Sequence, residues 1–219
     1  MSAETTVSTA VTVPPAVHVQ MTGTGQFAHA GAGSIAFDGS LGAPLRQVFR
    51  GFPAGTIGLA PGSVAEAYPQ WWGAKGQGKS DDTRAVQAAI DACNSVAVPP
   101  GDYLITSTIL VNNRMGFTLT GAGIQTTTLA AETAGMVLFR LRNTMYSSFN
   151  NLKVDGRSIA NRTLVIDQVR QGARYVTDQD FFTQVWFGYA TDTAVVVGDD
   201  NNGQTDRLRF DDCIFSNSP

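Results

Sequence analysis

The chain has 219 residues, a length that suits one globular domain, with or without a short leader, and allows a sizeable core. Only 15% of the residues are charged and the formal net charge is −3, which argues against a nucleic acid or another polyanion as partner. No stretch reaches the roughly 18 consecutive apolar residues of a membrane span, so no membrane partner is expected.

The N-terminal part, residues 1–70, predicts a leader of short β-strands. Residues 1–9 are polar and rich in Ser and Thr, and we expect them to be mobile. Residues 1–12 lack the basic start and the apolar run of a secretory signal. Alternating apolar residues predict short strands within residues 11–21, 35–37, 43–49 and 56–59.

Residues 71–100, WWGAKGQGKSDDTRAVQAAIDACNSVAVPP, combine a glycine-rich turn, a helix and an apolar strand. The helix is predicted at residues 82–93, where apolar side chains recur on one face at helical spacing. Ser80 or Asp82 can cap its free N–H groups, and Asp81 and Asp82 suit the positive end of the helix dipole. The strand follows at residues 96–98 and ends in two prolines.

The glycine-rich turn also matches the phosphate-binding pattern G-x-x-x-x-G-K-[ST] at residues 73–80. In that interpretation the backbone would cradle phosphates, and Lys79 and Ser80 would serve a phosphate and Mg²⁺. The pattern requires a buried strand directly upstream, whereas Pro69 and two tryptophans precede this turn. We therefore do not expect nucleotide binding.

After the helix, short strands bounded by Gly, Asn or Asp follow one another, and no second helix of normal length is expected. Strand and turn units at roughly 20 to 30 residues suit a solenoid, and an antiparallel sandwich would also give short strands with turns. The chain stops directly after a strand, so we expect a fragment or an end that a partner covers. The strands are predicted at residues 96–98, 103–106, 108–111, 117–119, 136–141, 152–154, 164–166, 181–187, 194–197 and 208–215.

The stretch from Trp71 to Tyr103 resembles the N-terminal signature of the pectate-lyase-like superfamily of right-handed parallel β-helices. That signature runs roughly W-[WF]-G-A-K-G-D-G-x-x-D-D-T-x-A-[IV]-Q-x-A-I-D, followed by an apolar strand and P-x-G-x-Y. The chain departs from it in the glycine turn at Gln77, where the family usually has Asp. The matching residues are Trp71, Trp72, Gly73, Ala74, Lys75, Gly76, Gly78, Asp81, Asp82, Thr83, Ala85, Val86, Gln87, Ala89, Ile90, Asp91, Pro99, Pro100, Gly101 and Tyr103.

The resemblance implies an all-β fold, a right-handed parallel β-helix whose short N-terminal helix caps the solenoid and is not catalytic. Residues 71–219 would be the start of this β-helix, incomplete at its C-terminus. Residues 1–70 would be leader coils, the alternative being a separate particle-attachment domain. Enzymes of the superfamily act on polysaccharides as lyases or hydrolases, but no catalytic motif of the family can be placed on this chain.

Carboxylates on the outer faces of neighbouring coils are the candidates for acid–base glycoside hydrolysis, which needs two carboxyl groups roughly 5 to 10 Å apart. Each is also explained as a turn residue or as a solvated strand residue, so Asp155, Asp211 and Asp212 remain weak catalytic candidates. The full set of candidates is Asp155, Asp180, Asp199, Asp200, Asp211 and Asp212.

Aromatic side chains are the candidates for stacking on sugar rings. Trp186 and Tyr189 are the weak substrate-binding candidates, with Tyr146 and Phe187 beside them, whereas Trp71 and Trp72 are expected to plug the end of the core. His18 and His29 are isolated, and Cys93 and Cys213 are expected to be buried free thiols. Residues 199–203 are expected to form a turn, and no motif predicts a metal or another cofactor.

Two functions stay open. The first is a phage tailspike-like or secreted protein that binds, and as a lyase or glycoside hydrolase cleaves, a polysaccharide. The second is a structural virion or surface protein that uses the β-helix as a rigid scaffold. Either predicts a place in the virion or outside the cell, and a homotrimer or other virion proteins as partners.

Overall fold

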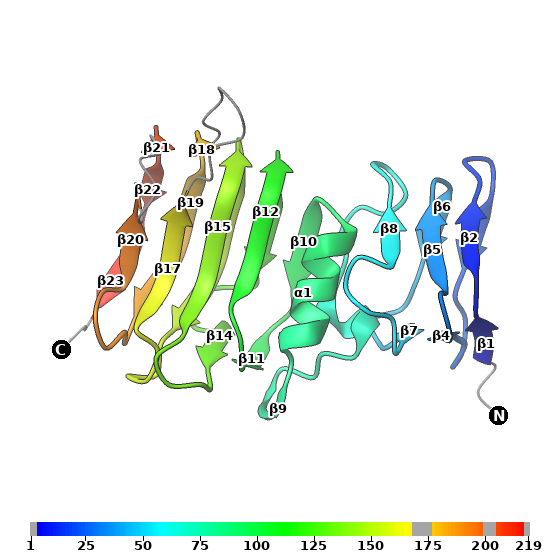
Figure 1. Ribbon diagram of the computed structural model, residues 1–219, viewed down its shortest axis with the longest axis horizontal. Helices are drawn as coiled ribbons and strands as arrows, with labels where there is room; N and C mark the ends of the chain where they lie inside the picture. Colours follow the sequence, from blue (N-terminus) through cyan, green and yellow to red (C-terminus); the bar gives the residue numbers. More distant parts are fainter. Residues whose placement is uncertain (1–3, 168–176, 199–204, 217–219) are drawn as a thin grey trace. The chain divides into compact units, whose positions relative to one another are not determined.

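The computed structural model describes residues 4–167, 177–198 and 205–216. Within these ranges the fold is all-β apart from helix α1 (Thr83–Ala92) and a 3₁₀ helix, η1 (Pro69–Trp72), and its strands pair predominantly in parallel (Figure 1). Parallel pairing excludes the antiparallel sandwich. No helix of these residues is both long and apolar enough to cross a membrane.

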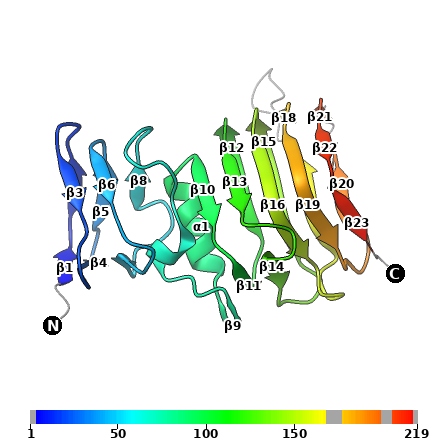
Figure 2. The same cartoon turned by 180° about the vertical axis from the view of Figure 1, so that it is seen from behind.

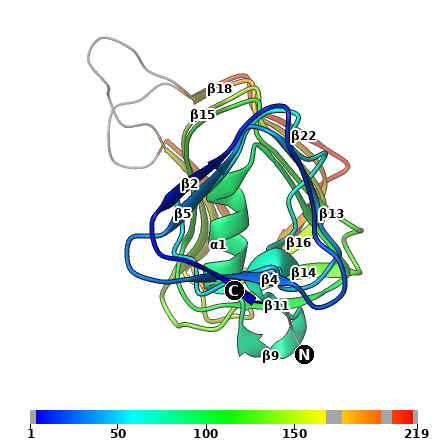
Figure 3. The same cartoon turned by 90° about the vertical axis from the view of Figure 1, so that its right-hand side faces the viewer.

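The chain divides into two compact units, Met1–Lys75 with Arg84–Ala97 and Gly76–Thr83 with Val98–Pro219. The first unit holds three small parallel sheets. Glu4 pairs with Gln26 and Ala10 with Ser34, intervals of 22 and 24 residues. Figure 3 shows β2 and β5 of one sheet lying one behind the other. The strands are β1 (Glu4–Val7), β4 (Gln26–His29) and β7 (Phe49–Arg50); β2 (Ala10–Val13), β5 (Ser34–Phe37) and β8 (Ile57–Leu59); and β3 (His18–Gln20) with β6 (Ser40–Gly42).

Two local predictions for this unit are wrong. Residues 4–7 are not a mobile start, because they form strand β1, which pairs with β4. Residues 43–48 are not a strand, and β7 begins only at Phe49. Pro44 has no N–H to donate to a ladder, and its carbonyl oxygen instead accepts a 3.1 Å hydrogen bond from Trp71 Nε1.

Aromatic side chains fill the core of this unit, and both tryptophans belong to it. Trp71 and Trp72 are buried, as predicted, and their rings lie 6.5 and 5.1 Å from that of Phe49. Helix α1 confirms the predicted helix, and its apolar side chains, such as Val86 and Ile90, are fully buried.

The glycine-rich turn leads into a strand, β9 (Gln77–Asp81), which excludes the phosphate-binding interpretation because Lys79 and Ser80 would have to begin a helix. Gly76 has a φ of +59°, and a Cβ there would lie 2.8 Å from the ring of Tyr103. Asp82 Oδ2 accepts the N–H of Gly76 at 2.9 Å.

The start of α1 settles one of the two predicted caps. The carboxylate of Asp81 accepts the N–H of Thr83 at 2.9 Å, whereas the Ser80 hydroxyl has no partner. The predicted cap at Ser80 is therefore wrong, and Asp81 supplies a hydrogen-bond acceptor for a free N–H at the start of the helix.

The second unit repeats the parallel pairing at longer intervals. Asp102 pairs with Thr128 and Ser148 with Phe181, intervals of 26 and 33 residues. Figure 1 shows β12, β15 and β17 side by side, and Figure 2 shows β13, β16 and β19 from behind. Strand β10 (Ser95–Val98) belongs mostly to the first unit. The remaining strands of the second unit are β11 (Gly101–Ile105), β12 (Ile109–Met115), β13 (Thr118–Gly121), β14 (Thr127–Ala131), β15 (Val137–Met145), β16 (Ser148–Asp155), β17 (Arg162–Asp167), β18 (Thr177–Asp178), β19 (Phe181–Gly188), β20 (Val195–Val197), β21 (Thr205–Asp206), β22 (Arg209–Asp211) and β23 (Ile214–Ser216).

All ten strands predicted after the glycine turn overlap an observed strand, but two details differ. Strands β14, β18 and β21 were not predicted. The single strand expected at residues 208–215 is two strands, β22 and β23, because Asp212 has a φ of +50° and breaks the extended backbone.

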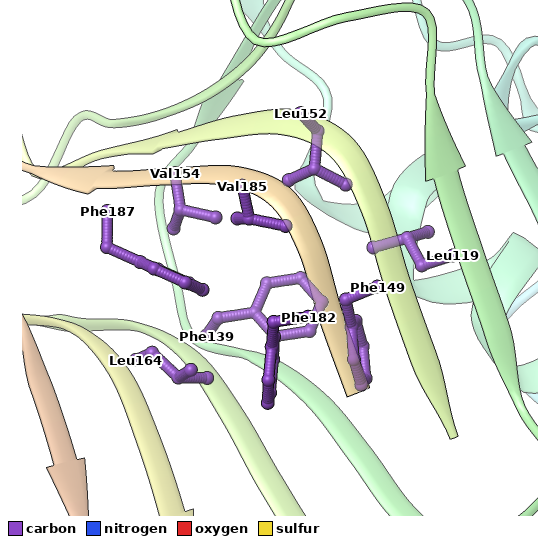
Figure 4. Close-up of a pocket in the computed structure, with 9 residues that line it drawn as sticks. All are labelled: Leu119, Phe139, Phe149, Leu152, Val154, Leu164, Phe182, Val185 and Phe187. Carbon is purple, nitrogen blue, oxygen red and sulfur yellow. The ribbon is translucent and has the colours of Figure 1, made fainter. Parts of the chain in front are cut away.

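The core of the second unit is a stack of phenylalanines. The rings of Phe149, Phe182 and Phe210 follow one another at centroid distances of 5.1 and 4.7 Å, and their planes are nearly parallel. Figure 4 shows the apolar side chains around a small cavity of about 10 Å³ between them. Cys93 is a buried free thiol, as predicted. Cys213 is free but only half-buried, so its predicted burial is confirmed in part, and this burial raises the pKa of its thiol.

Candidate functional site

The outer face of the second unit's sheet β11–β14–β16–β19 carries a row of polar and aromatic side chains. Tyr103, Leu129, Val154 and Phe187 are buried beneath it, so the residues that alternate with them point outward. The strand register sets the first outward row as Asp102, Thr128, Lys153 and Trp186. The next row along the strands is Leu104, Ala130, Asp155 and Gly188.

A hollow of about 300 Å³ lies on this face, and we call it the outer-face groove. Its size is at the low end of the range for small-ligand sites, which is about 300–1,000 Å³. Strands that are far apart in the sequence supply its walls. The lining residues are Gly78, Asp102, Leu104, Thr128, Ala130, Lys153, Asp155 and Arg157.

Lys153 is held tightly at one side of the groove. Its Nζ lies 2.7 Å from Asp155 Oδ2, and it sits 4.3 Å from the ring centre of Trp186 and 4.8 Å from that of Tyr189. Asp155 Oδ1 accepts the backbone N–H of Arg157 at 2.8 Å. An ion pair and two cation–π contacts therefore fix the ammonium, and Asp155 is fixed through both carboxylate oxygens.

The two other charged residues of the groove differ in their partners. Arg157 forms an ion pair with Glu132. Asp102 is exposed, and within the described part of the chain its side chain makes no hydrogen bond or ion pair. The groove thus presents one carboxylate that is available to a ligand.

The structure brings three predicted residues together at this site. Asp155 lines the groove, and Trp186 and Tyr189 lie beside it with Lys153 between them. Trp186 Nε1 donates a 2.6 Å hydrogen bond to Ser216 Oγ, which fixes the indole on the sheet surface. Both rings remain partly exposed, as a sugar-stacking platform requires.

The other catalytic candidates lie elsewhere. Asp211 pairs with Arg209 at 2.7 Å on β22, and Asp212 forms the bend before β23, so neither lines the groove. Asp180 is wrong as an outward carboxylate, because it is fully buried and accepts hydrogen bonds from the Thr144 hydroxyl and the Ser147 N–H. Asp199 and Asp200, with the turn expected at residues 199–203, lie outside the described residues.

The remaining singled-out residues do not join the groove. Phe187 is buried and cannot serve as a platform, whereas Tyr146 is half-exposed at a bend after β15. His18 hydrogen-bonds Ser40 Oγ at 2.7 Å, and His29 packs against the ring of Phe52. No group of three His, Cys, Asp or Glu residues in the described ranges could hold a metal ion.

Asp102, Lys153 and Arg157 are site residues that the sequence did not single out. Asp102 stands one residue before Tyr103 of the family signature, and Lys153 stands two residues before Asp155. Outward alternation within each strand could have indicated them, because Tyr103 and Val154 are buried neighbours. Their proximity depends on register across strands, which no single stretch of sequence shows.

The two carboxylates of the groove are widely spaced. Asp102 and Asp155 are two strands apart and two residues apart along the strand, which places their Cα atoms about 12 Å from each other. Catalytic carboxyl groups of glycosidases are about 5 to 9.5 Å apart. A Cα separation does not fix the distance between the carboxyl groups, but Asp155 is already held by Lys153 and by the N–H of Arg157. The groove therefore offers one free carboxylate, whereas acid–base cleavage needs two.

A family model described as "Rhamnogalacturonase A/epimerase, pectate lyase-like" matches residues 71–218, which is more than half of the chain. The chain belongs to this family. The match confirms the resemblance seen at Trp71–Tyr103 and, with the parallel strands, indicates a function related to polysaccharides. No curated protein and no solved structure matches the chain.

Proposed function

We propose that this family member binds a polysaccharide on the outer-face groove, and that its parallel strands are successive coils of a right-handed parallel β-helix. The observation that carries the proposal is a hollow with a free carboxylate, Asp102, beside two partly exposed aromatic rings. Carboxylates accept hydrogen bonds from sugar hydroxyls, and aromatic faces pack against the apolar faces of sugar rings.

Coils that stack in register give such a ligand a long, rigid surface. Asp102, Thr128, Lys153 and Trp186 follow one another across four paired strands, a row of about 14 Å. Because neighbouring strands are hydrogen-bonded along their length, the row is preorganised and little side-chain or loop ordering is needed on binding. A short oligosaccharide that runs across the strands would contact the whole row.

The test is affinity electrophoresis in gels that contain single polysaccharides, with Trp186→Ala and Tyr146→Ala as matched variants. Both residues are partly exposed aromatics of the second unit, but only Trp186 lies beside the groove. We expect retardation of the wild-type chain, about tenfold weaker binding for Trp186→Ala, as loss of one stacked ring would give, and unchanged binding for Tyr146→Ala. If Tyr146→Ala loses binding and Trp186→Ala does not, the polysaccharide binds at the bend after β15 and not at the groove.

The scaffold function remains a second proposal. It is favoured over catalysis because Asp155 is held by Lys153 and the Arg157 N–H, which leaves one free carboxylate in the groove where acid–base hydrolysis needs two. A tailspike-like virion part predicts a homotrimer, because sister chains could form glycan grooves between them. Light scattering tests this: a trimeric mass supports the virion proposal, whereas a monomeric mass favours a secreted protein. Incubation with the retained polysaccharide, followed by a reducing-end assay, tests cleavage.

A further inference from the structure

Among the described residues, each cation that lines the outer-face groove already has a carboxylate partner. Lys153 is bound to Asp155 at 2.7 Å, and Arg157 is bound to Glu132. Lys153 is also covered by two aromatic rings, and its side chain is only 16% exposed. Each positive charge of the groove therefore already has a carboxylate within contact distance.

The negative charges are not balanced in the same way. The groove and its immediate partners comprise three carboxylates, Asp102, Asp155 and Glu132, against two cations, Lys153 and Arg157. The neighbouring strand β9 adds Lys79 and Asp81, one charge of each sign. The surplus charge is negative and lies at Asp102, the residue that faces a ligand without a partner in the described part of the chain.

We infer that the outer-face groove selects uncharged polysaccharides and rejects polyuronates, an inference that rests on the proposed function. A uronate carboxylate could reach a cation that lines the groove only by displacing Asp155 from Lys153 or Glu132 from Arg157, and it would then lie close to Asp102. The hydroxyl groups of an uncharged sugar meet no such obstacle. They donate to the free carboxylate of Asp102, while the apolar ring faces pack against Trp186 and Tyr189.

The test is isothermal titration of the full chain with neutral dextran, mannan and galactan and with polygalacturonate, at low ionic strength. We expect at least one neutral polysaccharide to bind at least tenfold more tightly than polygalacturonate. Asp102→Asn should weaken the binding of the neutral polysaccharide about threefold to tenfold, because the substitution removes a charged hydrogen-bond acceptor. Asp102→Lys should lower the preference for the neutral ligand by supplying a free cation.

The matched control is Asp212→Asn, which removes an exposed carboxylate in the same unit, at the bend before β23 and outside the groove. Asn tolerates the φ of +50° at that position. It should leave both affinities unchanged. Polygalacturonate that binds as tightly as the neutral ligands would overturn the inference and leave the proposed function standing. If the affinity for the neutral polysaccharides is the same in both Asp102 variants as in the wild type, the role of Asp102 is overturned. Absence of binding to all four polysaccharides would count against the proposed function itself.

Discussion

Two outer faces of the second unit carry charged side chains in register, but they use them differently. On the β12–β15–β17 face, Arg140 and Arg142 both bind the carboxylate of Asp167, whose side chain is only 3% exposed. On the β11–β14–β16–β19 face, Asp102 is exposed and has no partner among the described side chains. The same pleated geometry therefore builds a closed ionic cluster on one face and an open groove on the other.

The difference shows how to separate structural from functional carboxylates in such a protein. Asp167 and the buried Asp180 are satisfied by neighbouring strands, so their removal should change stability. The side chain of Asp102 makes no hydrogen bond or ion pair within the described part of the chain, so its removal should change only what the groove binds. Burial and partners distinguish the two kinds, whereas residue type does not.

The largest effect is expected from Asp167→Ala. It leaves the guanidinium groups of Arg140 and Arg142, which are only 25% and 32% exposed, without their shared carboxylate. The free energy of unfolding should fall by about 3 kcal/mol, measured by urea denaturation. Asp192→Ala is the control, because Asp192 is 59% exposed and its pair with Arg162 is 3.5 Å long; it should lose less than about 0.5 kcal/mol. Equal losses in the two variants would contradict the comparison.

A smaller effect is expected from Lys153→Met, which keeps the aliphatic stem but removes the ion pair with Asp155 and the cation–π contacts with Trp186 and Tyr189. We expect a loss of about 1 to 2 kcal/mol in unfolding free energy and a change in tryptophan fluorescence. Lys79→Met, on the exposed part of β9, is the matched control and should change neither measurement. Unchanged fluorescence in Lys153→Met would show that the ammonium does not lie over Trp186.

Much of the fold was accessible from the sequence because one stretch combines several local rules. Residues 71–103 place the buried tryptophans, the glycine turn and the helix, and alternation located most later strands. Bends were harder to place, because Tyr146, Gln179 and Arg207 adopt φ values of +54°, +57° and +55°, a region that usually favours glycine. The parallel neighbours on each side fix these bends, and local propensity does not reveal them.

The site was accessible only in part. Asp155, Trp186 and Tyr189 were candidates because of their residue types, yet Asp102 was not, although it is the groove's free carboxylate. Asp102 and Lys153 lie in the same row because Asp102 pairs with Thr128, 26 residues later, and Thr128 pairs with Lys153, another 25 residues later. These intervals vary along the chain, so the sequence alone could not align the outward residues of successive strands.

Asp102→Ala should have almost no effect on folding, which is the sharpest contrast with Asp167→Ala. Asp102 is exposed, and its side chain makes no hydrogen bond or ion pair with the described residues that the substitution would remove. The unfolding free energy of the Asp102→Ala variant, measured by urea denaturation as for Asp167→Ala, should stay within about 0.5 kcal/mol of the wild-type value. A loss above about 1 kcal/mol would mean that Asp102 supports the fold and would remove the distinction between the two faces.

The smallest effect concerns Glu4 on β1, an exposed counterpart of Asp167. Hydrogen bonds from Arg50 and then from Gln26 lower the pKa of Glu4 below its ordinary value. A lowered folded-state pKa stabilises the fold above the unfolded-state pKa, and that contribution is lost as the pH falls through the folded-state value. Arg50→Ala should therefore raise the pKa of Glu4 in an NMR titration and barely change stability at neutral pH, because solvent screens the exposed pair. A pKa that stays low in Arg50→Ala would mean that Gln26 alone holds the carboxylate in its charged form, since its amide donates to Glu4 Oε2 at 2.7 Å.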